Sequence, residues 1–245
     1  MRRVLFSALL LALCVCSAFG QQKAKSWTEL SEKEAAKILN DSPWSQTQTE
    51  GDESQPRQTS AVTQVAAPRS ADRQLSREGE APDIKAARVI KFRMRFLSAK
   101  PVRGAFARIV ALRKGEIDEN LSTELQGFVD RDFADYVVVA VNAEASDPKL
   151  VGRAMQLLTT ATAETLKEKV YLERKDGKKL PLADYRPPGT DGMGAKFVFM
   201  RNVEGQPFLT ADSDNVRFFA QLSEKLKLNA KYKVSEMMYD GKLEY

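Results

Sequence analysis

The folded part of this chain is predicted from the way apolar and polar residues alternate after residue 88. Over residues 88–96 every second side chain is large and apolar, as in a half-buried strand. The residues between them predict a basic outer face: Lys91, Arg93 and Arg95. Residues 102–110 and 119–128 indicate helices. Residues 136–141 form an apolar, largely β-branched run, which is typical of a central strand buried on both faces.

Short strands and turns are expected to dominate the second half of the domain. Asp147 followed by Pro148 predicts the start of one more helix. Beyond it, Asp176-Gly177 and Asp240-Gly241 are hairpin signals, because both residue types tolerate positive φ. Residues 216–222 fit a strand or a short helix. We therefore predict an α+β fold class, with helices mainly in the first half of the folded domain packed on a largely antiparallel sheet.

The N-terminal segment, residues 21–44, carries one short helix signal. Ser31 and Glu34 have the spacing of a capping box, and both tryptophans of the chain flank this helix. A helix this short is marginal alone, so its apolar side chains must pack on something. They either pack on the protein's own core or anchor a partner, because tryptophan is enriched at binding hot spots. The residues of the hypothetical partner site are Trp27, Leu30, Ile38, Leu39 and Trp44.

Residues 45–83 have the composition of a disordered linker. They are rich in Gln, Ser, Thr, Glu, Arg and Pro and contain no aromatic residue. Such a segment buries too little apolar surface to offset the entropy cost of ordering it. The predicted divisions are thus a signal peptide (1–20), an N-terminal helix (21–44), a linker (45–83) and an α+β domain (84–245).

The first residues have the layout of a secretory signal peptide. A cationic start is followed by an apolar run over residues 4–16 and by the small residues Ala18 and Gly20, which predict cleavage before Gln21. Leu13 and Val15, which precede the two cysteines, are bulkier than a lipoprotein cleavage box requires. We expect a periplasmic or extracellular protein without a transmembrane segment in the mature chain.

Composition excludes several kinds of catalytic site. The chain contains no histidine, and both its cysteines lie in the predicted signal peptide. The mature chain therefore lacks His-dependent nucleophile systems, His or Cys metal ligands and disulfides. No remaining pattern identifies catalytic residues, a metal site or a cofactor. A hydrolase that uses Ser98 with Lys100, or paired carboxylates, stays open as an alternative.

The charge pattern indicates a second alternative, an anion-binding surface. Residues 85–114 hold ten lysines and arginines and no acid. Clustered cations suit anionic polymers or lipid headgroups, and export favours envelope polymers over nucleic acid. On this hypothesis the ligand would bind at Lys91, Arg93 and Arg95. The competing interpretation is that residues 116–135, with seven acids and one arginine, neutralise this stretch.

A glycine-rich stretch, residues 185–196, is a further candidate for anion binding. Its three glycines, with Arg186 and Lys196, would let backbone N–H groups approach an anion. A connecting loop is the favoured interpretation, because the order differs from a phosphate-binding loop and a strand follows Lys196.

Three segments, 27–30 (WTEL), 40–44 (NDSPW) and 238–245 (MYDGKLEY), resemble features of an uncharacterised family of exported bacterial proteins. The resemblance implies bacterial export and no particular activity. The function we predict is a non-enzymatic exported interaction or envelope-associated protein. Its partner would be another envelope protein or an anionic envelope polymer.

Overall fold

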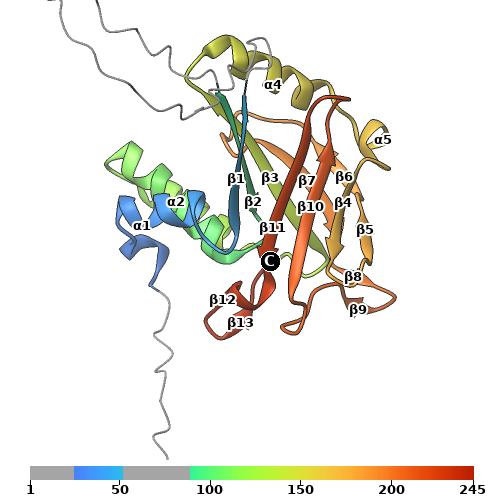
Figure 1. The fold of residues 1–245 in the computed structure, drawn as a ribbon. Helices are drawn as coiled ribbons and strands as arrows, with labels where there is room; N and C mark the ends of the chain where they lie inside the picture. The colour runs from blue at the N-terminus through green and yellow to red at the C-terminus, as the bar shows by residue number, and fades with distance from the viewer. Residues whose placement is uncertain (1–24, 52–88) are drawn as a thin grey trace, which may run out of the picture.

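The computed structural model describes residues 25–51 and 89–245. The predicted signal peptide with its two cysteines, and residues 52–83 of the predicted linker, lie outside the described residues. The described part contains two larger antiparallel sheets, two two-stranded antiparallel sheets and two groups of helices (Figure 1). The predicted α+β class is confirmed, but the strands form two larger sheets and two small ones where one sheet was expected.

The larger sheet has five strands in the order β1-β2-β3-β7-β6. Their bounds are β1 (Ser45–Gly51), β2 (Val89–Phe96), β3 (Tyr136–Ala145), β7 (Ala195–Met200) and β6 (Asp184–Arg186). The prediction of a central strand at 136–141 is confirmed, because β3 lies in the middle of this sheet and residues 137–141 are all buried.

Strand β1 corrects the predicted linker, which was expected to begin at residue 45. β1 pairs with β2 from Ser45 opposite Arg95 to Gly51 opposite Val89. Its sequence is polar throughout, so composition gave no strand signal. An edge strand can be polar because its partner satisfies its backbone groups while its side chains stay near solvent.

The smaller sheet has four strands in the order β11-β10-β4-β5. Their bounds are β11 (Lys227–Lys233), β10 (Asn215–Gln221), β4 (Val170–Arg174) and β5 (Lys179–Pro181). The hairpin predicted at Asp176-Gly177 is confirmed, with Gly177 at a φ of 82°. Residues 215–221 form a strand, which settles the ambiguity between strand and helix.

The two sheets enclose one aromatic core. Phe197 of β7 packs edge-on against Phe218 of β10 at 5.3 Å, and Phe96 of β2 against Tyr232 of β11 at 4.8 Å. The Gln48 side chain joins the sheets where β1 meets β11. It accepts a hydrogen bond from the main-chain N of residue 229 at 2.7 Å and donates one to the main-chain O of residue 227 at 2.8 Å.

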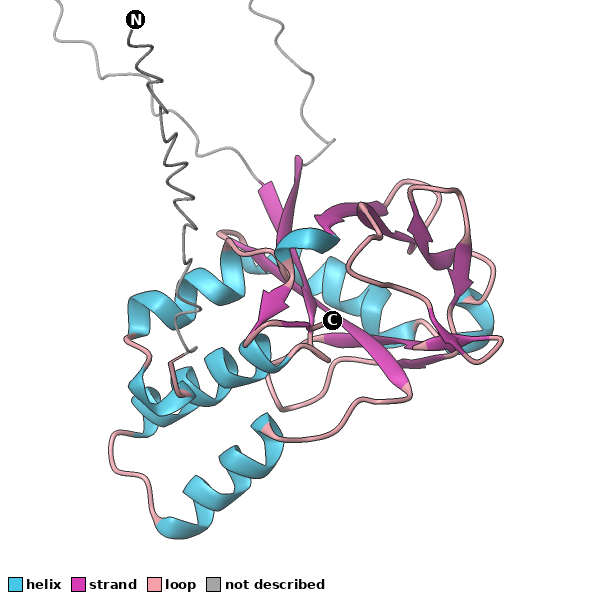
Figure 2. Cartoon of the chain, turned by 90° about the horizontal axis from the view of Figure 1, so that it is seen from below, coloured by secondary structure: helices cyan, strands magenta, loops and turns pink. Residues whose placement is uncertain are grey.

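The helices cover two sides of the strands. Figure 2 shows one group beside the larger sheet, and Figure 1 shows α4 across its upper end. The first group consists of η1 (Trp27–Glu29), α1 (Glu32–Asn40), α2 (Lys100–Lys114) and α3 (Glu119–Val129); the second is α4 (Pro148–Thr160) and α5 (Ala163–Leu166). The capping box predicted at Ser31 and Glu34 is confirmed, and so is the start of α4 after Asp147.

Short elements complete the second half of the domain. They are β8 (Asn202–Val203), β9 (Gln206–Pro207), η2 (Val234–Glu236), β12 (Met238–Tyr239) and β13 (Lys242–Leu243). The hairpin predicted at Asp240-Gly241 is the β12–β13 pair, which brings the last residues beside β1 and α2.

Candidate functional site

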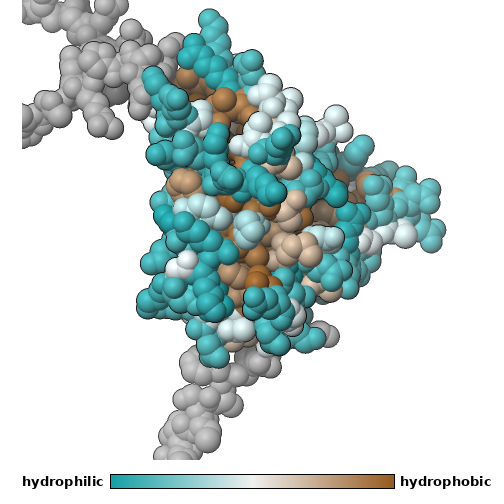
Figure 3. Space-filling view, turned by 90° about the vertical axis from the view of Figure 1, so that its right-hand side faces the viewer, coloured by the Kyte–Doolittle hydropathy of each residue, from teal (hydrophilic) through white to brown (hydrophobic). Residues whose placement is uncertain are grey.

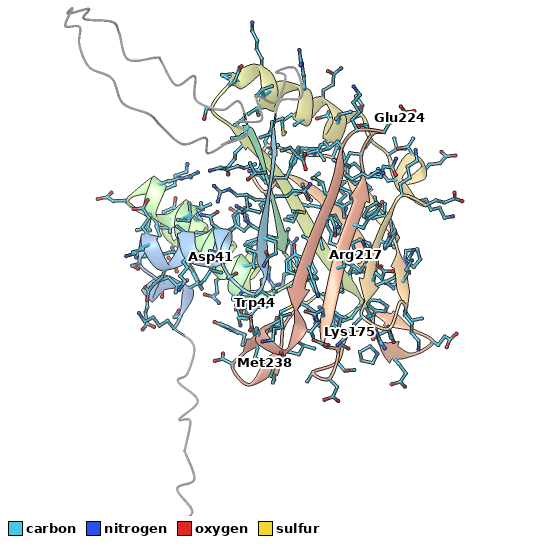
Figure 4. All side chains as sticks on the ribbon, viewed as in Figure 1. Asp41, Trp44, Lys175, Arg217, Glu224 and Met238 are labelled. Carbon is cyan, nitrogen blue, oxygen red and sulfur yellow. The ribbon has the colours of Figure 1, made fainter. Side chains whose placement is uncertain are left out.

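The two tryptophans of the N-terminal segment are buried in their own domain. Trp27 is 7% exposed, and its indole nitrogen donates to Gln126 Oε1 of α3 at 2.8 Å. Trp44 is 8% exposed, and its indole nitrogen donates to the main-chain oxygen of Glu244 at 2.7 Å. Figure 4 shows Trp44 near the lower end of β1, close to the hairpin that carries Met238. The interpretation that both indoles pack on the protein's own core is confirmed.

The other three residues of the hypothetical partner site also face the domain. Leu30 and Leu39 are buried, and Ile38 is half-buried against the main core. The Leu30 main-chain oxygen accepts a hydrogen bond from Arg108 of α2. A tethered arm required these side chains to be free of the domain, and this packing contradicts it.

The basic strand does not present three free cations to solvent. Arg95 is 4% exposed and donates to the Leu39 main-chain oxygen, and burial lowers its pKa to about 10. Arg93 forms an ion pair with Glu144 at 2.8 Å. Only Lys91 of the three is exposed. The predicted anion site at Lys91, Arg93 and Arg95 is therefore wrong, because β2 uses this face to hold α1 and β3.

Ser98 and Lys100 do not form a nucleophile and base pair. Ser98 is buried, and its Oγ accepts a hydrogen bond from the Val138 main chain at 3.0 Å. The Lys100 ammonium group donates to Asp130 at 2.7 Å, and this hydrogen bond raises the pKa of Lys100. A catalytic lysine needs the opposite shift, so this geometry argues against Ser-Lys hydrolysis.

In the glycine-rich loop, residues 185–196, the carboxylate of Asp191 occupies the hydrogen-bond donors that an external anion would need. The Asp191 carboxylate accepts hydrogen bonds from the Met193 main chain at 3.0 Å and from Lys196 Nζ at 2.7 Å. Burial raises the pKa of Asp191, but these hydrogen bonds outweigh it and hold the pKa below its ordinary value. Because the donors are engaged, the interpretation as a structural loop is supported.

A groove on the outer face of the larger sheet is the strongest candidate for a site. It has a volume of about 1270 Å³ and lies between α2–α3 and the outward side chains of β3 and β7. We call it the outer groove. Its floor is set by strand register, because Val138 lies opposite Val198 and Tyr136 opposite Met200. The alternate residues of both strands point into the core instead.

The floor of the outer groove is apolar and partly open to solvent. The two valines at its base are buried, whereas Tyr136 and Met200 are 45% and 46% exposed. Aromatic side chains from the helices and the following loop form one wall: Phe106, Phe128 and Phe133. Tyr136 and Met200 expose apolar surface beside these half-buried rings, and apolar surface gathered in a groove indicates a binding surface.

Charges of both signs rim the outer groove. Arg186 and Asp184 of β6 face each other at 3.6 Å, and Lys196 is paired with Asp191. Arg131 also lies on the rim. An apolar floor with a polar, mixed-sign rim is the usual anatomy of a surface that binds another polypeptide. Figure 3 looks onto the side of the molecule at the right of Figure 1, opposite α2, and shows apolar patches within a mostly hydrophilic surface there as well.

Two smaller hollows each contain charged side chains that are paired within the protein. One, of about 750 Å³, lies beside η1 and includes the Lys25–Glu34 ion pair at 2.6 Å. The other, of about 360 Å³, includes Asp130, whose carboxylate accepts from Lys100. The hydrogen bond from Lys100 lowers the pKa of Asp130, so this group stays ionised and does not suit a general acid.

Sequence reasoning missed the outer groove, although one signal for it was present. Residues 136–141 were expected to be buried on both faces, and Tyr136, the single large polar-tipped residue in the run, is exposed. Its neighbour across the sheet, Met200, is likewise the exposed last residue of an otherwise mainly buried strand. The groove itself depends on how far α3 stands from the sheet, which no local pattern encodes.

Within residues 25–51 and 89–245, no three acidic side chains lie close enough together to hold a metal ion. No helix in this part of the chain combines the length and apolar character needed to cross a bilayer.

The chain matches no protein-family model and no curated protein. One solved structure is similar, a novel protein of unknown function from Burkholderia pseudomallei K96243. The two share 10% sequence identity with a TM-score of 0.40, over 58% of this chain and 74% of the other. A bacterial protein of unknown function is thus a weak structural neighbour of this chain.

Proposed function

We propose that the protein is an exported, non-enzymatic binding module that holds an amphipathic helix of a partner polypeptide in the outer groove. The observation that carries the proposal is the pairing of Tyr136 with Met200 in the groove floor, where both are nearly half exposed. These side chains would anchor the apolar face of the partner helix.

The size and charge of the groove favour a polypeptide over a small ligand. Its volume of about 1270 Å³ exceeds the range of roughly 300–1,000 Å³ that is usual for small-molecule pockets. An acyl chain would carry one charged end, whereas the rim offers Arg131 and, from another element, the Arg186–Asp184 ion pair. A helix with acidic and basic residues beside its apolar stripe meets both signs.

The test is a selection from a library of amphipathic helical peptides against the full chain, with counter-selection against Met200→Glu. Enriched peptides are then measured by fluorescence anisotropy. Met200→Glu places a charge in the floor and is expected to weaken binding about tenfold or more. Met238→Glu is the matched control, because Met238 is 40% exposed on a short strand outside the groove.

Peptides that bind both variants as tightly as the natural chain would contradict the groove. Failure to enrich any peptide, together with displacement of an apolar fluorescent dye by a long-chain fatty acid, would make the groove a lipid site instead. Export is tested separately by fractionating cells that produce the full chain. Mass spectrometry of the exported protein should show a chain that begins at Gln21.

A further inference from the structure

The outer face of the smaller sheet is basic. The outward positions of β4, β5, β10 and β11 carry five cations and one acid: Lys179, Arg217, Lys227, Lys231, Lys233 and Glu173. We call this surface the basic sheet face. In Figure 1 the smaller sheet lies at the front and right, and no helix lies in front of it. Figure 4 shows Arg217 midway along β10.

Strand register places four of these charges in one row across the sheet. Lys179 lies opposite Glu173, Glu173 opposite Arg217, and Arg217 opposite Lys231. Neighbouring strands are about 4.8 Å apart, so the row crosses the sheet in roughly 15 Å. Glu173 accepts hydrogen bonds from Arg217 and so fixes the guanidinium group in this row.

Two aromatic rings hold the cations in place. Tyr171 and Phe219 stack with their ring centres 5.0 Å apart and their planes 23° apart. Lys179 Nζ lies 4.3 Å from the Tyr171 ring centre, and the Arg217 guanidinium carbon lies 5.6 Å from the Phe219 ring centre. The Tyr171 ring is therefore in contact with both an aromatic ring and a cation.

Strand β11 adds a second line of charge, along the strand instead of across it. Lys227, Lys231 and Lys233 are exposed at alternate positions, with Asn229 between them. Lys233 pairs with Glu236 at 2.7 Å. Lys227 and Lys231 form no ion pair within the part of the chain that the structure describes. Such a surface has cations available for an external anion without breaking internal pairs.

We propose that the basic sheet face binds an acidic polysaccharide whose carboxylate or sulfate groups pair with Lys179, Lys227 and Lys231. The charge of the face complements a polyanion. Lys227 and Lys231 lie four residues, about 14 Å, apart along β11, so separate anionic groups of one flexible charged chain can pair with both. This site lies on the opposite sheet from the outer groove, so it does not depend on the function proposed above.

Other anionic partners fit the same surface less well. Sequence-tolerant binding of single-stranded nucleic acid uses free aromatic faces for base stacking, and here Tyr171 stacks on Phe219 and contacts the Lys179 ammonium group. Proteins that bind a membrane surface insert apolar side chains into it in addition to their charge contacts. The large apolar side chains that are exposed in the described residues all lie outside these four strands: Val110, Leu112, Ile117, Tyr136, Met200, Val203 and Met238.

The experiment is affinity electrophoresis of the full chain in gels that contain polygalacturonate or heparin, at several salt concentrations. The double variant Lys227→Gln/Lys231→Gln is expected to bind roughly tenfold more weakly and with a smaller salt dependence. The matched control is Lys33→Gln/Lys114→Gln, which removes the same charge from exposed positions on α1 and α2. Circular dichroism checks that both double variants keep the fold.

The proposal is supported if the polysaccharide gel retards the Lys227→Gln/Lys231→Gln variant less than the natural chain and retards the control variant as much as the natural chain. Equal losses in both double variants would show that net charge alone drives binding, and would overturn it. The same holds if neither polysaccharide retards the natural chain. Tighter binding to an oligothymidylate or to phosphatidylglycerol vesicles than to either polysaccharide would assign the face to nucleic acid or membrane, and would also overturn the proposal.

Discussion

Trp44 and Glu244 are hydrogen-bonded although 200 residues separate them in the chain. The indole nitrogen of Trp44 donates to the Glu244 main-chain oxygen, and the Glu244 carboxylate accepts a hydrogen bond from the Lys100 main-chain N–H at 3.1 Å. The N-cap of α2 is Ala99, whose side chain cannot accept a hydrogen bond. One residue near the end of the chain thus joins the N-terminal segment to the start of a helix.

Replacing Trp44 with Phe should destabilise the domain. The change leaves the part-buried Glu244 oxygen without its donor and removes part of a packed ring, which should lower the free energy of unfolding by about 1–3 kcal/mol. Urea unfolding measures the effect. Tyr136→Phe, at an exposed aromatic residue, is the control and should change stability by less than about 0.5 kcal/mol. Equal stability of the two variants would contradict the role of this hydrogen bond.

Two helical glycines should respond differently to alanine. A Cβ at Gly152 would meet no atom within 4 Å, so Gly152→Ala should stabilise α4 by about 0.5–1 kcal/mol. A Cβ at Gly104 would lie 3.1 Å from the Trp27 Cβ and force η1 to shift. We expect Gly104→Ala to be at least about 1 kcal/mol less favourable than Gly152→Ala in thermal unfolding. An equal gain in stability from both substitutions would mean that η1 is not packed closely against α2 at Gly104.

Two glycines of the 185–196 loop form a second matched pair. Gly192 and Gly194 both have positive φ, at 69° and 86°. An added Cβ at Gly194 would lie 2.2 Å from the Val141 main-chain oxygen in the central strand, whereas at Gly192 it would meet nothing within 4 Å. Gly194→Ala should cost more than about 4 kcal/mol or prevent folding, and Gly192→Ala only about 1–2 kcal/mol. Soluble yield and urea unfolding distinguish these outcomes.

Arg95 is expected to be structural. Arg95→Met removes the donor to the Leu39 oxygen at the end of α1, and should lower the free energy of unfolding by about 1–3 kcal/mol. Lys91→Met on the same strand is exposed and should change it by less than about 0.5 kcal/mol. If the two substitutions have the same effect on chemical unfolding, the buried arginine does not hold α1.

The hydrogen bonds of Glu34 in the α1 capping box should make the free energy of unfolding depend on pH in the acidic range. Hydrogen bonds from Lys25 and then from Ser31 lower the pKa of Glu34 to about 2. Since the folded-state pKa lies below the unfolded value of about 4.3, the contribution is complete above pH 4.3 and is lost as pH falls towards 2. Glu34→Gln should flatten this part of the profile, with a small effect because the group is exposed. An unchanged slope in urea unfolding between pH 5 and 2.5 would contradict this account.

Local pattern was sufficient for much of the fold. The capping box at Ser31 and Glu34, the start of α4 after Asp147 and the hairpin at Asp176-Gly177 each depend on residues a few positions apart. Backbone geometry and hydrogen bonding act over that same range, so the sequence carries the signal directly. The central strand was also predictable, because burial on both faces demands an apolar run.

The local sequence pattern was misleading or insufficient where hydrogen bonds from a distant segment of the chain decided the structure. The polar strand β1 exists because β2 pairs with its backbone, and composition alone indicated disorder. The basic residues of β2 were expected at the surface, yet Arg95 is buried because α1 places carbonyl oxygens over it. The sequence left open whether the Trp44 segment packs on its own domain, and the end of the chain decides this by accepting its indole hydrogen bond.

The sequence by itself determined the α+β class, the short-range turns and caps, and the absence of histidine throughout the chain. Only the tertiary structure decided which cations lack an ion-pair partner, that both tryptophans are buried, and where apolar side chains are exposed to solvent. The outer groove combines α2, α3, β3 and β7, and the basic sheet face combines four strands from separate parts of the chain. A surface of either kind is defined by distances between segments, and those distances follow from packing and strand register, which depend on the whole chain.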